Sequence, residues 1–198
     1  GAGGLVSAYI ASAVKASVTL VEGHKMGGDC LNFGCVPSKA LIRSAKMAKQ
    51  LHKAEELGFT GTQGAVDFAA VMRRVHRVIA DIAPHDSVER YTGLGVDVVQ
   101  GHARITGPWS VEITRSDGSQ QTLTTRNIVI AAGASPFVPP IPGLEHTGYL
   151  TSDTVWGLTE LPRRLVVLGG GPIGSELAQS FARLGAMTTQ VEMAERIL

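Results

Sequence analysis

The sequence is poor in cysteine, with only two among its 198 residues, and these lie close together as Cys30 and Cys35. A small secreted domain stapled by disulfide bonds would usually carry more cysteines. No apolar run approaches the roughly 18 residues needed to cross a bilayer, and no secretory signal is visible. We therefore expect a cytoplasmic protein in which the cysteine pair has a redox or metal-binding role.

The sequence also has almost no excess of charge of either sign, and it has few aromatic side chains. The 18 lysines and arginines are balanced by 17 aspartates and glutamates, which gives a formal net charge of +1. This balance gives no electrostatic reason to expect binding to nucleic acid or to an anionic membrane. Aromatic residues make up 5% of the chain, too few to favour the stacking platforms that bind single-stranded nucleic acid. We therefore expect neither a nucleic-acid nor a membrane partner.

Glycine, in contrast, is abundant, with 24 residues, and it dominates the first four positions. Apolar residues at helical spacing follow, and a buried strand is then expected over residues 17–22, ending at Glu22. Glycine-rich turn, helix, strand and terminal acid are the order of a dinucleotide-binding unit. Gly1 and Gly4 have the spacing of the second and third glycines of G-x-G-x-x-G, so we expect the first strand and first glycine to be missing. The alternative is that Gly1 and Gly3 are the first two glycines of a shortened loop.

A complete G-x-G-x-x-G motif spans residues 169–174, after an apolar strand expected over 164–168. Its glycines permit a tight turn and let a pyrophosphate approach the backbone at the start of the next helix. The following strand, over 188–192, ends in Glu192, whose carboxylate can accept a hydrogen bond from a ribose 2′-hydroxyl and would repel a 2′-phosphate. We therefore expect NADH in preference to NADPH, although Arg196 nearby could compensate. A solvated acid at the end of a strand is the alternative interpretation of Glu192.

The sequence between these two units predicts a loop over 27–34, two helices and a group of strands. The first helix is expected over 36–57, with Pro37 in its first turn, where the missing N–H costs nothing. The second helix is expected to begin at an Asp67 cap and to break at Pro84. Strands are expected over 96–99, 111–114, 121–124 and 127–130.

This group of strands has the pattern of a small antiparallel meander inserted in an α/β domain, with Asp117-Gly118 as a hairpin turn. A proline-rich stretch over 136–142 is typical of a linker. We therefore predict an α/β fold with two Rossmann-like nucleotide-binding domains, over residues 1–148 and 149–198. Two parallel strands cannot bury a core alone, so we expect the second domain to be an N-terminal part and the sequence to be truncated at both ends.

The spacing of the cysteines, C-x4-C, favours a redox pair over a zinc site. Zinc usually requires a closer pair and two further ligands, and the sequence has no other cysteine. A structural pair of thiols is the remaining alternative. Cys35 comes just before a predicted helix start, where the helix dipole favours a thiolate. Lys39 follows four residues later on the same helix face, where its ammonium group would favour nearby anions, although an exposed helix lysine is the simpler interpretation.

Residues 27–41 (GGDCLNFGCVPSKAL) resemble the redox-active site of the class I pyridine nucleotide-disulfide oxidoreductases. This family includes dihydrolipoyl dehydrogenase, glutathione reductase and mercuric reductase, and the C-x4-C-V-P-S-K signature is highly specific. The resemblance extends over essentially the whole sequence, through landmarks at 101–104, 128–133, 151–153 and 169–176. It implies an FAD-binding domain over 1–148 without its first strand, the start of an NAD(P)H-binding domain over 149–198, and no interface domain.

The resemblance also implies roles for individual residues. Cys35 would be the thiol beside the flavin, and Cys30 would be the interchange thiol that meets the substrate. Lys39 would lie near the flavin N5 and pair with Glu176. Contacts to FAD are implied for Gly1, Gly4, Glu22, Gly28, Asp29, Lys39, Ala103, Ala132 and Gly133. Contacts to NAD(H), or alternatively NADP(H), are implied for Gly169, Gly171, Pro172, Ile173, Gly174 and Glu192.

The implied activity is that of a homodimeric, FAD-dependent oxidoreductase. It would pass electrons from NAD(P)H through FAD to a Cys30–Cys35 disulfide and on to a disulfide or mercuric-type substrate. Asp29 stands where dihydrolipoyl dehydrogenases and glutathione reductases usually have threonine, which favours a mercuric reductase-like branch. The family's histidine–glutamate acid–base pair would belong to the absent interface domain. The alternatives are a flavoprotein NADH oxidase or transhydrogenase-like enzyme, against which the cysteine spacing argues, and a non-catalytic truncated fragment.

Overall fold

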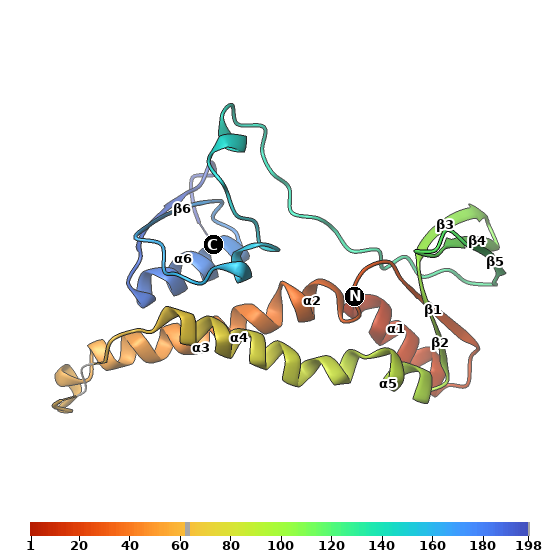
Figure 1. The fold of residues 1–198 in the computed structure, drawn as a ribbon, viewed down its shortest axis with the longest axis horizontal. Coiled ribbons are helices and arrows are strands. Elements are labelled where there is room, and N and C mark those ends of the chain that lie inside the picture. The colour runs from red at the N-terminus through yellow and green to blue at the C-terminus, as the bar shows by residue number, and fades with distance from the viewer. Residues whose placement is uncertain (62–63, 198) are drawn as a thin grey trace. The chain divides into compact units, whose positions relative to one another are not determined.

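The computed structural model describes residues 1–61 and 64–197 (Figure 1). The chain divides into two compact units, each made of two stretches of sequence. Unit 1 comprises Gly1–Asn32 and Ala80–Ser135, and unit 2 comprises Phe33–Ile79 and Pro136–Leu198. Leu198, the end of the second predicted domain, lies outside the described residues. Both units combine helices with small sheets, so the predicted α/β class is confirmed.

Unit 1 is built on two parallel strands, β1 (Val18–Glu22) and β2 (Val96–Gln100), which pair from Val18 opposite Val96 to Glu22 opposite Gln100. Its helices are α1 (Ala2–Ala13), the five-residue α2 (Gly28–Asn32) and α5 (Val88–Gly93). A small core joins α1 and α5 to β2. Its buried residues are Leu5, Ala8, Tyr91 and Val96. The glycine turn, helix and strand order expected at the start of the chain is therefore present.

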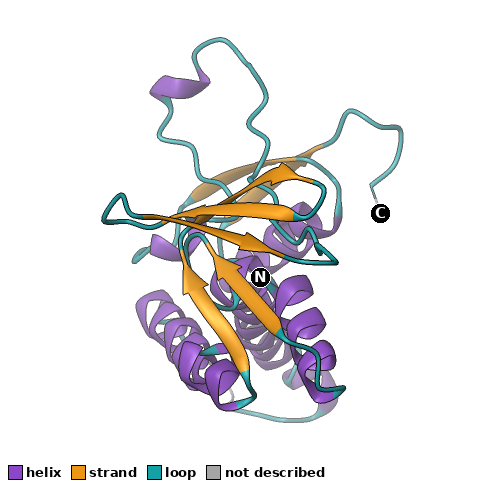
Figure 2. Ribbon diagram, turned by 90° about the vertical axis from the view of Figure 1, so that its right-hand side faces the viewer, coloured by secondary structure: helices purple, strands orange, loops and turns teal. Residues whose placement is uncertain are grey.

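Unit 1 also carries an antiparallel meander, drawn in orange in Figure 2, of β3 (His102–Gly107), β4 (Ser110–Thr114) and β5 (Gln120–Thr124). The predicted hairpin lies between β4 and β5: Gly118 has φ +81°, and the Ser119 N–H donates to Asp117 Oδ1 over 2.8 Å. Two details of the prediction were wrong. β2 pairs with β1 and not with the meander, whose first strand is β3, and residues 127–130 form no strand.

Unit 2 contains the long helix α3 (Cys35–His52), most of α4 (Phe68–Ile82), α6 (Pro172–Leu184) and the parallel strands β6 (Arg164–Leu168) and β7 (Met187–Val191). In Figure 1, α3 and α4 run side by side, and their apolar faces share one core with α6. Leu41 and Val75 are completely buried there, and Phe181 is 1% exposed. The ring of Phe68 lies 5.9 Å from that of Phe181, between centroids.

The observed helix boundaries differ in part from those that the apolar pattern predicted. The helix expected over 36–57 ends at His52. A separate 3₁₀ turn over Glu55–Leu57 follows, and it ends at Gly58, which has φ +84°. The Asp67 cap is confirmed, because its Oδ1 accepts the Ala70 N–H over 2.9 Å. The remaining 3₁₀ turns span Ala83–Asp86, Leu144–His146 and Val155–Gly157.

The break predicted at Pro84 is present, since α4 ends at Ile82 and a 3₁₀ turn replaces it. The expected loop over 27–34 was wrong in part, because it contains α2. Over the described parts of the chain, none of the helices combines the length and apolar character that crossing a membrane requires.

Candidate redox and nucleotide-binding sites

Each cysteine belongs to a helix, and both are thiols in this structure. Cys30 is half-buried in α2, and Cys35 is the exposed first residue of α3. The N-cap residue of α3 is Gly34, which makes no side-chain cap hydrogen bond. The carbonyl of its N-cap residue, Gly34, accepts the first helical hydrogen bond from the Ser38 N–H over 3.0 Å. The first N–H groups of α3 can therefore stabilise an anion such as the Cys35 thiolate.

A tight glycine turn precedes α2. Gly27 and Gly28 have φ values of +83° and +57°, in the left-handed region that favours glycine. A side chain on Gly28 would collide with the Cα atom of Gly1, so the backbone of the first glycine segment approaches this turn closely. Asn32 closes the turn by donating from Nδ2 to the carbonyls of Met26, over 3.0 Å, and Gly28, over 2.8 Å. The role of Asn32 was not predicted from the sequence. The feature that could have indicated it is a side-chain amide at the end of a short segment that begins with glycine.

The first glycine segment lies beside Glu22. The Gly1 amino group lies 3.5 Å from Glu22 Oε2, and the His24 N–H donates to Glu22 Oε1 over 2.8 Å. A Cβ atom on Gly4 would lie 3.5 Å from the side chains of Ala131 and Leu20, which is ordinary van der Waals contact. The structure thus brings Gly1, Gly28 and Glu22 together within unit 1.

Apart from Lys39, which is in unit 2, the other residues implied to contact FAD lie on exposed parts of unit 1. Asp29 is exposed on α2, and Ala103 is exposed on β3, where it pairs with Ile113. Ala132 and Gly133 follow β5 in an exposed segment without regular structure. Gly133 has φ +75°, and a Cβ there would meet no described atom within 4 Å, so the backbone is open to an approaching ligand.

Lys39 and Glu176 form the ion pair that the resemblance implied. The Nζ atom of Lys39, on α3, lies 2.7 Å from both Oε1 and Oε2 of Glu176, on α6. Both residues belong to unit 2, in which α3 packs against α6. The two side chains are 61% and 38% exposed. The pair therefore lies at the surface of the unit, one helical turn from Cys35 along α3.

The second glycine loop has the steric properties of a phosphate-binding turn. Gly169 has φ +112°, and a Cβ atom on Gly174 would collide with the Gly169 carbonyl oxygen. In contrast, a Cβ on Gly169 or Gly171 would meet no described atom within 4 Å. Gly171 caps α6, no side chain occupies that cap, and Pro172 and Ile173 begin the helix. The loop is thus closely packed at Gly174 and open at Gly169 and Gly171. It lies at the start of α6, the positive end of the helix dipole.

Glu192 follows β7 and contacts this loop. Its carboxylate accepts hydrogen bonds from the Gly170 N–H through Oε2 and from the Ala194 N–H, over 2.8 Å, through Oε1. The backbone N–H groups of Ala194, Gly170 and Met193, in that order, lower the pKa of Glu192. The side chain is therefore a carboxylate whose remaining lone pairs can accept hydrogen bonds from a ligand.

A polar network that sequence reasoning missed supports the same loop. Gln190 Nε2 donates to the Gly169 carbonyl over 3.0 Å and to Ser175 Oγ over 3.1 Å. Ser175 Oγ in turn donates to the Gly170 carbonyl over 3.1 Å. Gln190 and Ser175 thereby connect β7, the glycine loop and the first turn of α6. The signal was a glutamine within an otherwise strand-like segment.

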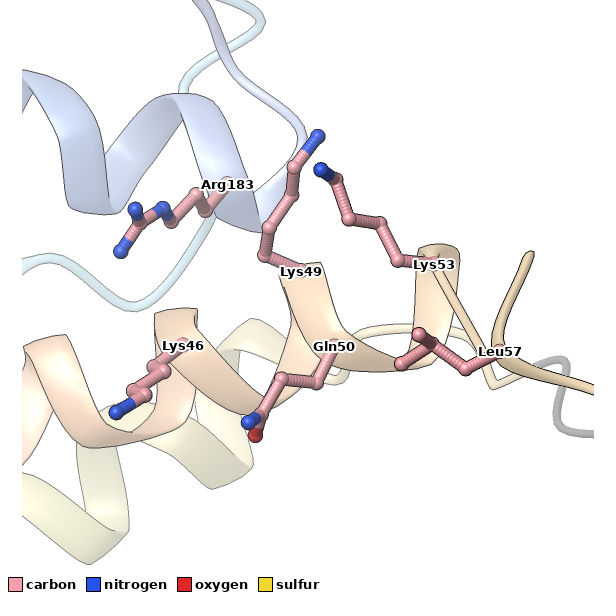
Figure 3. A pocket seen from close by; sticks show the side chains of 6 residues that line it. All are labelled: Lys46, Lys49, Gln50, Lys53, Leu57 and Arg183. Carbon is pink, nitrogen blue, oxygen red and sulfur yellow. The ribbon is translucent and has the colours of Figure 1, made fainter. Parts of the chain in front are cut away.

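A separate basic pocket of about 460 Å³ lies at the far end of α3, shown in Figure 3. It is lined by Lys46, Lys49, Gln50, Lys53, Leu57 and Arg183. At 1.5 Å per helical residue, Lys46 lies about 16 Å along α3 from Cys35. None of the residues predicted to bind a cofactor or to carry out chemistry lines this pocket. Among residues 1–61 and 64–197, no group of three His, Cys, Asp or Glu side chains forms a candidate metal site.

The features described for both units recur in one known family. A family model described as pyridine nucleotide-disulphide oxidoreductase matches residues 1–198. The chain belongs to this family, as the cysteine motif indicated.

Among its curated relatives, a dihydrolipoyl dehydrogenase from Chlorobaculum parvum is 37% identical over 201 residues, covering 100% of this chain and 42% of the relative. A mercuric reductase from Streptomyces lividans is 37% identical over 194 residues, covering 96% of this chain and 40% of the relative. Relatives carrying both names thus match it equally well.

Solved structures agree with this assignment. The Cu(II) complex of the HOCl-induced flavoprotein disulfide reductase RclA from Escherichia coli is 28% identical with a TM-score of 0.81, over 98% of this chain and 40% of that one. LpdA from Mycobacterium tuberculosis is 25% identical, also with a TM-score of 0.81, over 98% of this chain and 42% of that one. The chain therefore spans about two fifths of the length of these relatives.

Proposed function

We propose that this chain is the electron-relay portion of an FAD-dependent oxidoreductase that takes electrons from NAD(P)H and delivers them through Cys35 and Cys30 to a disulfide or mercuric-type substrate. The observation that carries the proposal is the arrangement on α3: Cys35 is its first residue, after the Gly34 N-cap, and Lys39, one turn later, is paired with Glu176. This places a thiol, a cation and a helix terminus on one short stretch of helix.

The glycine segments support binding of two nucleotides. At the second loop, the backbone of Gly169 and Gly171 is open to an approaching pyrophosphate, and the start of α6 would face its negative charge. At the first, Gly1, Gly28 and Glu22 offer a close-packed backbone with a carboxylate beside it. We assign FAD to residues 1–148 and NAD(P)H to 149–198.

When bound, FAD supplies the chemistry that links two-electron hydride donation by the nicotinamide to reduction of a disulfide. Cys35 would be the thiol that faces it, and the N–H groups at the start of α3 would stabilise its thiolate as a leaving group. Cys30 would then attack the substrate disulfide through its thiolate. Overall, NADH, one proton and a disulfide give NAD⁺ and two thiols; with mercuric ion, NADH and Hg²⁺ give NAD⁺, one proton and elemental mercury.

Relatives with different names support these two substrate classes. They include dihydrolipoyl dehydrogenases and mercuric reductases, and RclA was solved as a Cu(II) complex. A dithiol suits both chemistries, because thiolates attack disulfides and are also ligands of soft metal ions. The proposed whole enzyme is a homodimer.

Glu192 supports NADH as the preferred donor. Its carboxylate is held at the loop by the Gly170 and Ala194 N–H groups and would accept a hydrogen bond from a ribose 2′-hydroxyl. A 2′-phosphate at that point would be repelled by the carboxylate. The proposed donor is therefore NADH, with NADPH the weaker one.

The test is Cys35→Ser in the full-length enzyme, compared with Cys30→Ser. If Cys35 lies against the flavin, the Cys35→Ser variant retains bound FAD but loses the long-wavelength charge-transfer absorbance that appears on reduction. Cys30→Ser, which leaves the Cys35 thiolate in place, is expected to retain it. Persistence of the band in Cys35→Ser, with FAD bound, would reject the proposed role of Cys35.

A further inference from the structure

Trp156 makes a hydrogen bond that no feature of the cysteine motif requires. Its indole Nε1–H donates to the carbonyl of Phe33 over 2.8 Å, although 123 residues separate them in sequence. Trp156 is only 5% exposed and lies in the core of unit 2. Phe33 packs against the same core. A distant part of the chain is thereby attached to the segment immediately before Cys35.

The acceptor carbonyl has a specific position. Phe33 is joined by its peptide bond to Gly34, the N-cap of α3, and Cys35 is the first helical residue. The Gly34 carbonyl is held from the other side by the Ser38 N–H. Two successive carbonyls, one bonded to Trp156 and one to the helix itself, thus fix the peptide planes from which Cys35 projects.

Trp156 is itself held in place. The Nε2 atom of His76, on α4, lies 3.0 Å from the Trp156 backbone carbonyl. A carbonyl only accepts, so Nε2 carries the hydrogen in this contact. The neighbouring Val155 is 6% exposed and belongs to the same core. The indole is therefore a rigid donor, because both its backbone and its ring are fixed.

We propose that Trp156 is a positioning residue for Cys35: its indole N–H holds the Phe33 carbonyl and so sets the start of α3 and the direction of the Cys35 thiol. This rests on the proposed function only in taking Cys35 as a redox-active thiol. A purely structural tryptophan would contribute to stability through its buried ring alone. The positioning role predicts that the N–H itself tunes the thiol, because a thiolate is stabilised only if it is aligned with the N–H groups of the helix start.

The test measures the equilibrium of the full-length enzyme with glutathione, in which the Cys30–Cys35 disulfide and two glutathione thiols exchange with the protein dithiol and glutathione disulfide. Thiols are trapped and the cysteine peptides mapped by mass spectrometry, so no flavin signal is needed. One variant is Trp156→Phe. A second replaces Trp156 by 3-benzothienylalanine, which keeps the bicyclic shape and lacks the N–H. Trp109→Phe, at a tryptophan that is 64% exposed in unit 1, is the matched control.

Both Trp156 replacements are expected to lower the equilibrium constant for reduction by about fivefold, the effect of one ordinary hydrogen bond that stabilises the dithiol form and not the disulfide form. Trp109→Phe should leave it unchanged. An unchanged constant in the benzothienyl variant, with a melting temperature like that of the parent, would overturn the proposal. The outcome is separable from the proposed function: if the glutathione equilibrium shifts but Cys35→Ser keeps the long-wavelength band, positioning by Trp156 stands and the flavin-facing role of Cys35 fails.

Discussion

The ammonium group of Lys39 lies 2.7 Å from both carboxylate oxygens of Glu176, so an ion pair joins α3 to α6. Because the two side chains are 61% and 38% exposed, solvent screens their attraction, and the pair contributes at most about 1 kcal/mol to folding. Stability is therefore a weak reason for this pair. A cation held by two acceptors, one helical turn after Cys35, instead has a fixed position from which to act on a negatively charged ligand.

We expect Lys39→Met to leave the unfolding free energy within about 1 kcal/mol of the parent. In the full-length enzyme it should lower the rate of NADH-dependent flavin reduction at least about tenfold, because the fixed positive charge is lost. Stopped-flow absorbance measures this rate. Lys49→Met, on the same helix but in the basic pocket, is the control and should change neither quantity. Equal rates in the parent and Lys39→Met would contradict the proposed role of Lys39.

In the glycine loop over 169–174, two substitutions should separate an effect on folding from an effect on nucleotide binding. A methyl group at Gly174 would collide with the Gly169 carbonyl, so Gly174→Ala should destabilise the protein by about 1–3 kcal/mol. A methyl group at Gly171 would meet no described atom, so Gly171→Ala should leave stability nearly unchanged and weaken NADH binding, by filling the space proposed for the pyrophosphate. Urea unfolding and NADH titration measure the two effects. Tight NADH binding by Gly171→Ala would place the pyrophosphate elsewhere.

Gln190 is expected to act through the loop and not on the nucleotide itself. Gln190→Leu removes the donors to Gly169 and Ser175 while keeping a side chain of similar size. The KM for NADH should rise about fivefold with little change in kcat, because a looser loop lowers binding and leaves the later steps intact. Steady-state kinetics of the full-length enzyme provide the measurement. Thr189→Val, at the exposed neighbouring position of β7, should leave KM as it is.

The acid dependence of stability should report on Glu192. Backbone N–H groups, that of Ala194 foremost, hold the pKa of Glu192 in the folded protein below its value in the unfolded chain. Its stabilising contribution is therefore complete above the unfolded pKa, about 4.3, and is lost as the pH falls through the lower folded pKa. Urea unfolding should show Glu192→Gln less stable than the parent at pH 7, with the difference closing in strong acid. Glu195→Gln is the matched control, and a difference independent of pH would contradict this assignment.

Much of the fold was predictable because local patterns decide it. The strand over 164–168 was predicted to the residue, since an apolar run between an arginine pair and a glycine motif has clear limits. The Asp67 cap and the Asp117-Gly118 hairpin followed from side chains that bond to their own neighbouring backbone. Such signals need no knowledge of the rest of the molecule.

The errors arose where pairing decides the structure. β3 is largely exposed and mixes polar and apolar residues, so its own sequence does not predict a strand. Its strand geometry comes from pairing with β4. Residues 128–130 are apolar, but Val129 and Ile130 are 68% and 77% exposed, and they pair with no described strand. Apolar character predicts burial, and pairing requires a partner that the residues themselves do not specify.

The candidate site divides in the same way. The cysteine motif, Lys39 and the glycines could be recognised because their spacing along the chain matches a known pattern. The Gln190 network and the Trp156 bond join residues 15 and 123 positions apart, so a single sequence has no period or motif that would indicate them. The roles of the site residues and the limits of the two nucleotide-binding domains stay predictions.

The two tryptophans of this chain also differ in their surroundings, and fluorescence can detect this difference. Trp109 is 64% exposed, and Trp156 is 5% exposed and bonded to the peptide that leads into Cys35. In Trp109→Phe, the indole emission from this chain would come from Trp156 alone, at the short wavelengths of an apolar environment. Its intensity and lifetime would then follow the state of the helix start as the cysteines are oxidised and reduced. The chain thus carries a fluorophore hydrogen-bonded to the residue two positions before Cys35, and no added label is needed.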